Sequence, residues 1–344
     1  MVGVKFQLGD VKVRREGEMG GTASYLRGTP GPSGYSSAST AEDVTDGLDL
    51  SSKTVIVTGA TSGIGKESAR VLAKRGAHVI LAVRNVKLGE EVCGEIRAET
   101  PAARLDVMQL DLNSLASVRE FAGNFKSRNL PLNILLNNAG LLCMKFRLSE
   151  DGIEQSFATN HLGHFLLTEL LLDTIKATAK ESGEEGRIVN VSSYAHTMSY
   201  KPDDLDRISD PKRFVGFKSY GQSKLAQILH AKELTRRFQE EGVNVTANAL
   251  HPGTMDTGFG KNEASFKILT GIFFAVAGKF IKNTPQAAAT SCYVATNPKL
   301  KGVSGKYFFD CNEHLPENPA ACDMELAATY WKVSEELIAS KNKE

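Results

Sequence analysis

A tyrosine and a lysine in the stretch YGQSK have the spacing needed for proton transfer. Tyr220 and Lys224 are four residues apart, so on a helix their side chains lie on one face. A phenol has a pKa near ~10, which is too high for efficient proton exchange at neutral pH, and a lysine cation beside it favours the phenolate. Exposed helices often carry this pair by chance, so the pair needs support from other motifs.

A glycine-rich turn has the features of a phosphate-binding loop. In residues 54–85 a β-branched run precedes Gly59, Gly63 and Gly65, and an amphipathic run follows them. Glycines allow a close backbone approach to phosphate, and a helix N-terminus directs N–H groups at an anion. We therefore predict a dinucleotide site, with a purely structural turn as the alternative. The predicted contacts in this turn are Gly59, Thr61, Ser62, Gly63, Ile64 and Gly65.

The residue after the second predicted strand bears on the choice of nucleotide. NAD-binding units place an acid there, whose carboxylate accepts hydrogen bonds from the ribose and repels a 2′-phosphate. Here strand 78–83 is followed by Arg84, whose guanidinium suits a phosphate. We predict NADP(H) as the cofactor; the alternative is that Arg84 is a solvated residue at a strand end.

These residues need a scaffold, and the chain from Thr54 onward alternates β-branched runs with amphipathic ones. Strands are predicted at 54–59, 78–83, 105–112, 133–140, 187–193, 243–250 and 305–309. Helices are predicted at 64–75, 115–127, 152–179, 219–241 and 285–296. Near-continuous apolarity in the strands indicates that helices cover both faces of the sheet. We expect an α/β fold, a doubly wound (Rossmann) seven-stranded parallel sheet flanked by helices, in a single domain over 46–340.

The first 45 residues differ in composition from the rest of the chain. Residues 1–45 are rich in Gly, Ser, Thr and Pro and have few large apolar side chains, which predicts a flexible tail. An organelle transit peptide is the alternative. Asp10, Glu16 and Glu18 count against it, because transit peptides are poor in acids.

Whole-chain composition excludes several classes of function. The net charge of +1 and the scattered basic residues argue against a nucleic-acid surface. The five cysteines show no metal-ligand spacing, so we expect no metal and a reduced compartment. The most apolar run, 268–281, contains Lys279 and is shorter than the ~20 residues of a membrane span. We therefore expect no transmembrane segment.

Taken in order, the motifs resemble those of the short-chain dehydrogenase/reductase family. Gly-x-x-x-Gly-x-Gly is followed by NNAG (137–140), NHLGHF (160–165), VSS (191–193), YGQSK (220–224) and HPG (251–253). The resemblance runs from about residue 50 to 340. Several motifs in the family's order make a chance match a poor explanation.

The resemblance implies roles for individual residues. Ser193 and Tyr220 would bind the substrate, Tyr220 would exchange the proton, and Asn160 and Lys224 would complete the catalytic set. Further implied cofactor contacts are Asp111, Leu112, Asn138, Ala139, Gly140, Tyr220, Lys224, Pro252, Gly253, Thr254 and Thr257. His161 and His164 are interpreted as helix-packing positions, because Tyr220 already fills the acid–base role.

Three longer stretches resemble the retinol-dehydrogenase-like branch: FATNHLGHFLLTELLL (157–172), RIVNVSSYAH (187–196) and LHPGTMDT (250–257). Two more resemble its plant members, including those associated with the chloroplast envelope translocon: GYSSASTAEDVTDGLDLSSKTVIVTGATSGIG (34–65) and NPKLKGVSGKYFFDCN (297–312). Members of this branch typically use NADP(H). The resemblance therefore implies an NADP(H)-dependent alcohol dehydrogenase or carbonyl reductase (EC 1.1.1.-) that acts on a lipophilic carbonyl or alcohol. The rival interpretation is an NADPH-sensing interaction subunit of an envelope complex. We expect a cytoplasmic or chloroplast protein, not a secreted one. Family members often form homodimers through the helix that carries Tyr220 and Lys224.

The segment around 254–284 occupies the place of the family's variable substrate lid. Its run FKILTGIFFAVAGKF (266–280) is apolar and suits a lipophilic substrate. Ordinary core packing is one alternative. Another is a basic-flanked amphipathic helix that makes peripheral contact with a membrane surface or binds calmodulin.

Overall fold

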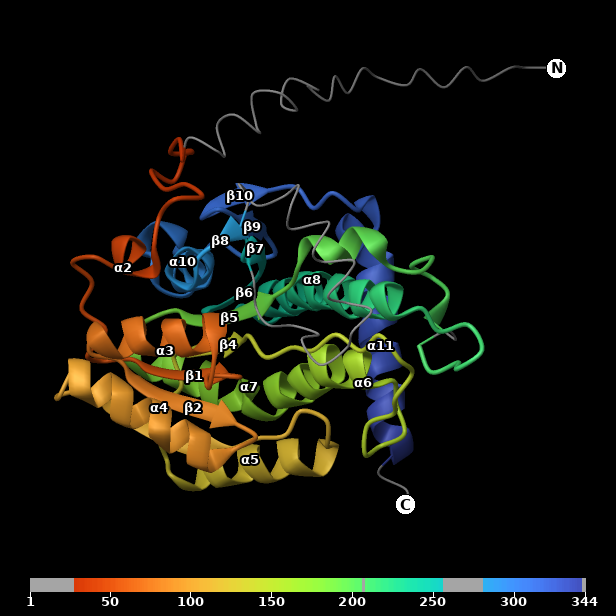
Figure 1. Ribbon diagram of the computed structural model, residues 1–344, viewed down its shortest axis with the longest axis horizontal. Coiled ribbons are helices and arrows are strands. Elements are labelled where there is room, and N and C mark those ends of the chain that lie inside the picture. The colour runs from red at the N-terminus through yellow and green to blue at the C-terminus, as the bar shows by residue number, and fades with distance from the viewer. Residues whose placement is uncertain (1–27, 206–207, 256–280, 342–344) are drawn as a thin grey trace.

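The computed structural model describes residues 28–205, 208–255 and 281–341 (Figure 1). Its main sheet has eight strands in the order β10-β9-β6-β5-β4-β1-β2-β3. The first four in sequence are β1 Thr54–Thr58, β2 His78–Val83, β3 Arg104–Gln109 and β4 Ile134–Asn137. The others are β5 Gly186–Val191, β6 Val245–His251, β9 Tyr307–Phe309 and β10 Asn312–His314. The doubly wound α/β fold predicted from the sequence is confirmed.

The expectation of seven parallel strands is wrong by one strand. β10 pairs antiparallel with β9, whereas the other neighbours in the sheet pair in parallel. The chain reverses at Asp310 and Cys311, whose φ angles are 50° and 61°. Positive φ at both central residues is the geometry of a two-residue hairpin turn. A cysteine rarely adopts it, so the sequence carried no signal for this hairpin.

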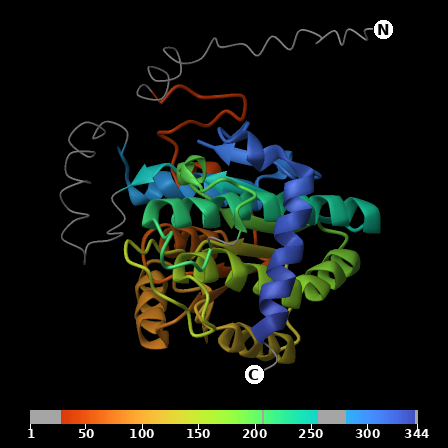
Figure 2. The same ribbon diagram turned by 90° about the vertical axis from the view of Figure 1, so that its right-hand side faces the viewer.

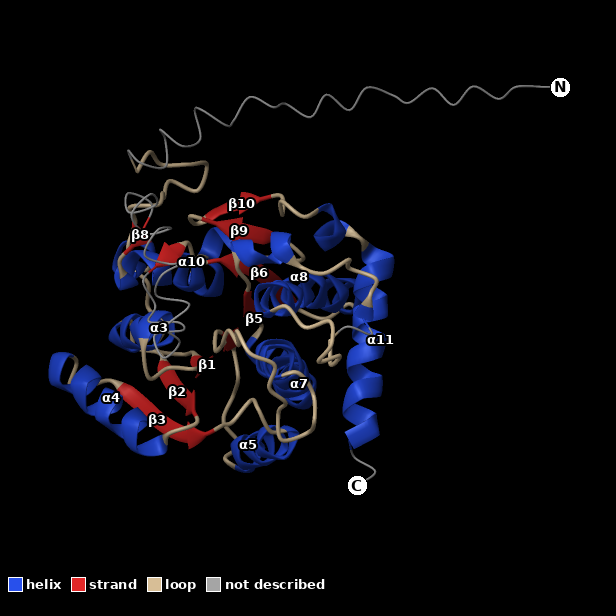
Figure 3. Ribbon diagram, turned by 45° about the vertical axis from the view of Figure 1, so that its right-hand side comes forward, coloured by secondary structure: helices blue, strands red, loops and turns tan. Residues whose placement is uncertain are grey.

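Helices cover both faces of the sheet, and β1 shows how its side chains are shared between them. Ile56 packs in one core cluster, while Val55 and Val57 pack in the other, as the period of two in a strand requires. One layer contains α5 Leu115–Ser127, α7 Gly163–Ser182, α8 Gly216–Glu241 and α11 Met324–Ser340. The opposite layer contains α3 Gly63–Lys74, α4 Val86–Glu99 and α10 Thr284–Thr296 (Figure 3).

The predicted helix 152–179 is interrupted near its start. A short α6, Gln155–Phe157, leads into a π-helical turn, Ala158–Leu162, before α7 begins. A π turn contains an extra residue and frequently marks a functional site. Asn160 lies in the middle of this turn and is fully buried.

Two of the long helices in the described ranges were not predicted, α4 and α11. Figure 2 shows α11 crossing α8, and Trp331 of α11 packs edge-on against Phe165 of α7 with ring centroids 4.8 Å apart.

Within the described ranges, no helix combines the length and the apolar character that a membrane crossing needs.

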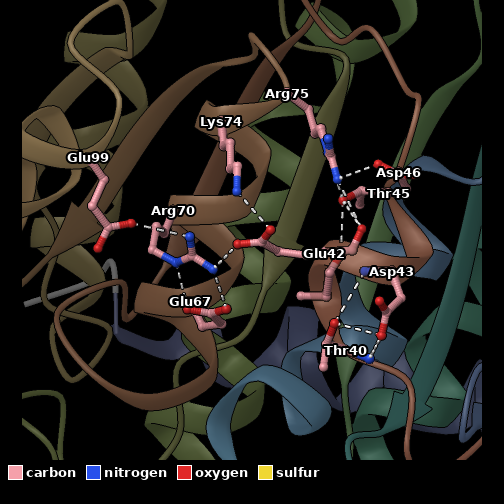
Figure 4. A network of polar contacts seen from close by, with 11 residues as sticks. Thr40, Glu42, Asp43, Thr45, Asp46, Glu67, Arg70, Lys74, Arg75 and Glu99 are labelled. Atoms are coloured by element: carbon pink, nitrogen blue, oxygen red, sulfur yellow. Dashed lines mark hydrogen bonds and ion pairs between the residues drawn. The ribbon is translucent and has the colours of Figure 1, made fainter.

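The described part of the predicted tail, residues 28–45, differs from the expected flexible segment. The short helix α2, Ala41–Val44, buries Ala41 and Val44 in the same core cluster as α3 and α10. Glu42 of α2 accepts hydrogen bonds from Arg70 at 2.8 Å and Lys74 at 2.7 Å, both on α3 (Figure 4). The folded domain therefore starts before residue 46. Residues 1–27 of the predicted tail lie outside the described residues.

Candidate active site

A cavity of about 590 Å³ lies at the carboxyl ends of the central strands. Its walls include Gly59 after β1, Asn138 after β4, Ser193 after β5 and Pro252 after β6. The chain runs from β1 to β2 on one side and β4 flanks β1 on the other, so this is the topological switch point where open α/β sheets bind ligands.

The glycine turn forms the floor of this cavity. Gly59 and Gly63 have φ angles of +68° and +52°, a region that favours glycine. At Gly65 an added Cβ would lie 2.4 Å from the Gly59 carbonyl oxygen. The turn therefore needs glycine at Gly65 for space and at the other two positions for backbone conformation.

The N-terminus of α3 is suited to an anion. Its N-cap residue, Ser62, makes no side-chain capping hydrogen bond, and the first N–H groups of a helix have no intrahelical acceptor. Ser62, Gly63, Ile64 and Gly65 all line the cavity. These features fit the pyrophosphate of a dinucleotide.

Thr58 ties the glycine turn to the NNAG stretch. Its Oγ1 accepts hydrogen bonds from the backbone N–H groups of Asn138 and Ala139, each at 2.9 Å. Asn138 Nδ2 in turn donates to the Thr58 carbonyl oxygen at 2.8 Å. The loops that follow β1 and β4 are thereby held together.

Arg84 is exposed at the end of the cavity beyond β2. Asp111 and Leu112, which follow β3, line the same end. The Asp111 carboxylate accepts a hydrogen bond from the N–H of Asn113 at 2.9 Å. Among the described residues, no carboxylate forms an ion pair with Arg84.

Three side chains with chemical function meet at the other end of the cavity. α8 carries Tyr220 and Lys224, and Ser193 follows β5. The Ser193 side chain is hydrogen-bonded to Tyr220, and Lys224 Nζ donates to the Val191 carbonyl oxygen at 2.8 Å. The neighbouring Ser192 faces α8, where its hydroxyl donates to the Lys224 carbonyl oxygen at 2.7 Å. Ser193 is thus the serine that shares the wall with Tyr220.

The pKa of Tyr220 depends chiefly on burial. Burial raises this pKa to about 12, and the hydrogen bond with Ser193 only partly opposes the rise. Burial also lowers the pKa of Lys224 to about 8. Desolvation is therefore the largest influence on the pKa of Tyr220 in this structure, and a lowering of this pKa by Lys224 stays a prediction.

Comparisons with known proteins agree with this geometry. A match to the family described as short chain dehydrogenase covers residues 53–203. "Short-chain dehydrogenase TIC 32 B, chloroplastic" of Brassica napus is 54% identical over 317 residues, which cover 92% of this chain and 98% of that protein. The chain belongs to the short-chain dehydrogenase/reductase family.

Two further comparisons give lower sequence identities. Retinol dehydrogenase 12 of Mus musculus is 40% identical over 295 residues, covering 86% of this chain and 89% of that protein. A crystal structure of an uncharacterized protein from Mycobacterium Paratuberculosis has a TM-score of 0.66 and 33% identity, covering 86% of this chain and 96% of that one. The predicted resemblance to the retinol-dehydrogenase-like branch and to plant chloroplast proteins is confirmed.

In this short-chain dehydrogenase/reductase, most of the predicted site residues share one cavity. Those on its lining are Gly59, Thr61, Ser62, Gly63, Ile64, Gly65, Arg84, Asp111, Leu112, Asn138, Ala139, Gly140, Ser193, Tyr220, Lys224, Pro252, Gly253 and Thr254. Asn160 lies behind the wall: its Oδ1 accepts from Leu141 N at 2.7 Å and its Nδ2 donates to Ser223 Oγ at 2.9 Å. Thr257 and most of the predicted lid lie outside the described residues.

Sequence reasoning missed several residues of the site in this family member. Leu141, Leu142, Tyr194, Met198 and His251 also line the cavity. His251 directly precedes the recognised Pro-Gly pair, so the HPG motif itself contained the signal. Tyr194 and Met198 lie in a short 3-10 helix, Tyr194–Met198, and nothing in their local sequence predicted that they face the site.

Proposed function

We propose that this protein is an NADP(H)-dependent oxidoreductase that transfers hydride between nicotinamide and a lipophilic carbonyl or alcohol. The observation that carries the proposal is the Ser193–Tyr220 hydrogen bond on the wall of a cavity whose floor is an uncapped helix N-terminus. One end suits a dinucleotide, and the other suits a carbonyl oxygen that accepts two hydroxyl donors.

When bound, the nucleotide supplies or accepts hydride at its nicotinamide ring. Ser193 Oγ and Tyr220 Oη orient the substrate oxygen, and Tyr220 Oη holds the proton that this oxygen gains or loses. A tyrosine pKa of about 12 keeps that proton in place at neutral pH until a strongly basic alkoxide develops. Lys224 Nζ lies 5.7 Å from the centre of the tyrosine ring, where its charge favours the phenolate that remains.

The choice of NADP(H) is supported by Arg84. Its guanidinium lies at the nucleotide end of the cavity, and no acid follows β2. A 2′-phosphate there gains a charge-assisted hydrogen bond, whereas the NAD ribose gains no carboxylate acceptor.

The lipophilic character of the substrate is supported by the residues around Ser193. Leu141, Leu142, Tyr194, Ala195 and Met198 line this end of the cavity. The residues Tyr194 and Met198 are 54% and 45% exposed, so a bulky apolar substrate would cover surface that water now contacts. Apolar area removed from water favours binding by about 25 cal/mol per Å².

The decisive experiment is a spectrophotometric screen of NADPH oxidation with retinal, steroid, terpenoid and aliphatic carbonyls. Tyr220→Phe is the control, because it removes the proton and keeps the ring. We expect at least one lipophilic carbonyl to be reduced by the native protein, with a loss of about 10²–10⁴-fold in the variant. Equal rates in both proteins would overturn the proposal.

An NADPH-sensing interaction subunit at the chloroplast envelope is the second candidate. The 54% identity with a chloroplastic relative supports the plastid location that this candidate requires. Binding and turnover separate the two candidates. Tight NADPH binding in both the native protein and Tyr220→Phe, without reduction of any carbonyl in the panel, would favour the sensor.

A further inference from the structure

A buried histidine joins the nucleotide end of the site to the turn that holds Asn160. His164 lies in the first turn of α7 and is fully buried. Its Nε2 is 2.8 Å from Thr58 Oγ1 and its Nδ1 is 3.0 Å from the Asn160 carbonyl oxygen. The ring therefore bridges β1 and the π turn, two elements that are distant in sequence.

The hydrogen bonds of Thr58 determine which nitrogen of His164 carries the proton. Thr58 Oγ1 accepts from two backbone N–H groups, which occupies both of its lone pairs. Its own proton is left to donate, and His164 Nε2 at 2.8 Å is much nearer than the Leu136 carbonyl oxygen at 3.4 Å. Nε2 is thus the acceptor, and the ring proton lies on Nδ1.

The other side of the ring holds the Asn160 backbone. With a proton on Nδ1, His164 donates to the Asn160 carbonyl oxygen, which Gln227 Nε2 also contacts at 2.7 Å. The side chain of Asn160 accepts a hydrogen bond from the backbone N–H of Leu141, on the cavity wall, and donates one to the Leu141 carbonyl oxygen. Burial lowers the pKa of His164 to about 3, so the ring is neutral at pH 7.

We propose that His164 is a positioning residue that couples the nucleotide-binding loops to the Asn160 turn through its Nδ1–H tautomer. Nε2 accepts the hydroxyl proton of Thr58. Thr58 Oγ1 is thereby oriented to accept hydrogen bonds from the backbone N–H groups of Asn138 and Ala139. Nδ1–H donates to the carbonyl oxygen of Asn160. This bond holds the Asn160 side chain where it makes its two hydrogen bonds with the Leu141 backbone. The sequence-based interpretation of His164 as a packing position misses this directional role.

The first test measures the tautomer in the native protein. Nitrogen-15 NMR of histidine-labelled protein distinguishes a protonated Nδ1 from a protonated Nε2. We expect His164 to carry its proton on Nδ1, with the assignment made from the spectrum of a His164 variant. A proton on Nε2 would overturn the proposal, and this measurement requires neither nucleotide nor substrate.

The second test separates the two sides of the ring by substitution. Glutamine places its amide near the position of Nε2, and asparagine places its amide near Nδ1. We expect His164→Leu to weaken NADPH binding and to lower kcat, each by about 10-fold, as for loss of one buried hydrogen bond. His164→Gln should restore most of the NADPH affinity, and His164→Asn should restore most of kcat.

His161 provides a matched control. It is equally buried one turn earlier, but its Nε2 contacts Ser334 of α11 at 2.8 Å, away from the cavity. His161→Leu should lower the melting temperature as His164→Leu does, while NADPH affinity stays within about twofold of native. Equal effects of the two leucine variants on NADPH affinity would contradict a positioning role.

The expected kcat effect rests on the proposed function, but the tautomer and the nucleotide affinity do not depend on turnover. If no carbonyl is reduced, the proposed substrate chemistry fails and the role of His164 is judged on those two measurements. If His164→Leu does not fold, the glutamine and asparagine variants and the native tautomer still decide.

Discussion

Several histidines of this protein are buried in their neutral form. Burial lowers the pKa of His164, His230 and His251 to about 3 each, and it holds the pKa of His161 well below its usual range. In the unfolded chain these groups titrate near ~6.5. Below that pH the unfolded state binds more protons than the folded state, so acid favours unfolding.

We predict that the free energy of unfolding falls as the pH is lowered from about 6.5 towards 3. Each such histidine contributes a slope of roughly 1.4 kcal/mol per pH unit. His161→Phe keeps an aromatic ring in place. Because the variant takes up about one proton fewer on unfolding, the slope between pH 5 and 6 should fall by roughly 1.4 kcal/mol per pH unit. Urea denaturation at several pH values measures this, and an unchanged slope in the variant would refute the assignment to His161.

Arg84 offers a second prediction at the scale of one residue. Arg84→Asp should lower the preference for NADPH over NADH by about 10–100-fold, because a charge-assisted contact is lost and a repulsive charge is gained. Lys87→Asp makes a similar charge change three residues later, outside the cavity lining. The ratio of dissociation constants for the two nucleotides should change only for Arg84. A similar change in both variants would point to a general electrostatic effect.

At the scale of elements, the glycine turn and the start of α3 act as one unit. Gly65→Ala would place a Cβ 2.4 Å from the Gly59 carbonyl oxygen and 2.5 Å from Asn138 Nδ2. We expect a loss of stability of about 1–3 kcal/mol and a clear loss of NADPH affinity. Thermal denaturation and fluorescence titration with NADPH measure the two effects.

Gly94 on α4 is the matched control for that substitution. An added Cβ meets nothing within 4 Å there, so Gly94→Ala should stabilise the protein by about 0.5–1 kcal/mol through helix propensity. NADPH affinity should not change. Native affinity in Gly65→Ala would show that the turn is not a nucleotide contact.

Elements with a local signal could be predicted from the sequence, and those that depend on distant contacts could not. The Tyr220–Lys224 spacing and the glycine turn are readable within a few residues. The bridge from Thr58 to His164 joins residues 106 positions apart, and only the fold brings them together. β10 depends on two residues with positive φ, neither of them glycine, so the predicted sheet lacked its last strand.

At the scale of the molecule, α11 closes the outer side of α8. Trp331 packs against Phe165 and His230, and the Arg237 guanidinium lies 3.8 Å from the centre of its ring. The exposed residues of α8 are Lys218 near its start and residues 239–241 at its end, so a homodimer through α8, as the family resemblance implied, would have to use these ends or displace α11. The C-terminal helix is thus part of the core.

We predict that Trp331→Ala lowers the free energy of unfolding by about 3–5 kcal/mol, the usual cost of truncating a large buried aromatic side chain. Met324→Ala is the control on the same helix, because Met324 is exposed, and it should change stability by less than about 0.5 kcal/mol. Urea denaturation followed by circular dichroism measures both. A small effect at Trp331 would mean that α11 docks only weakly.

The contacts of α2 set a limit on proteolytic maturation of the chain. Glu42 pairs with Arg70 and Lys74 of the helix that starts at the glycine turn, and Ala41 and Val44 are buried. A protease that cut after residue 45 would expose apolar surface and leave Arg70 with one carboxylate partner fewer. If the chain loses a leader on entry into an organelle, the new N-terminus must therefore precede Thr40.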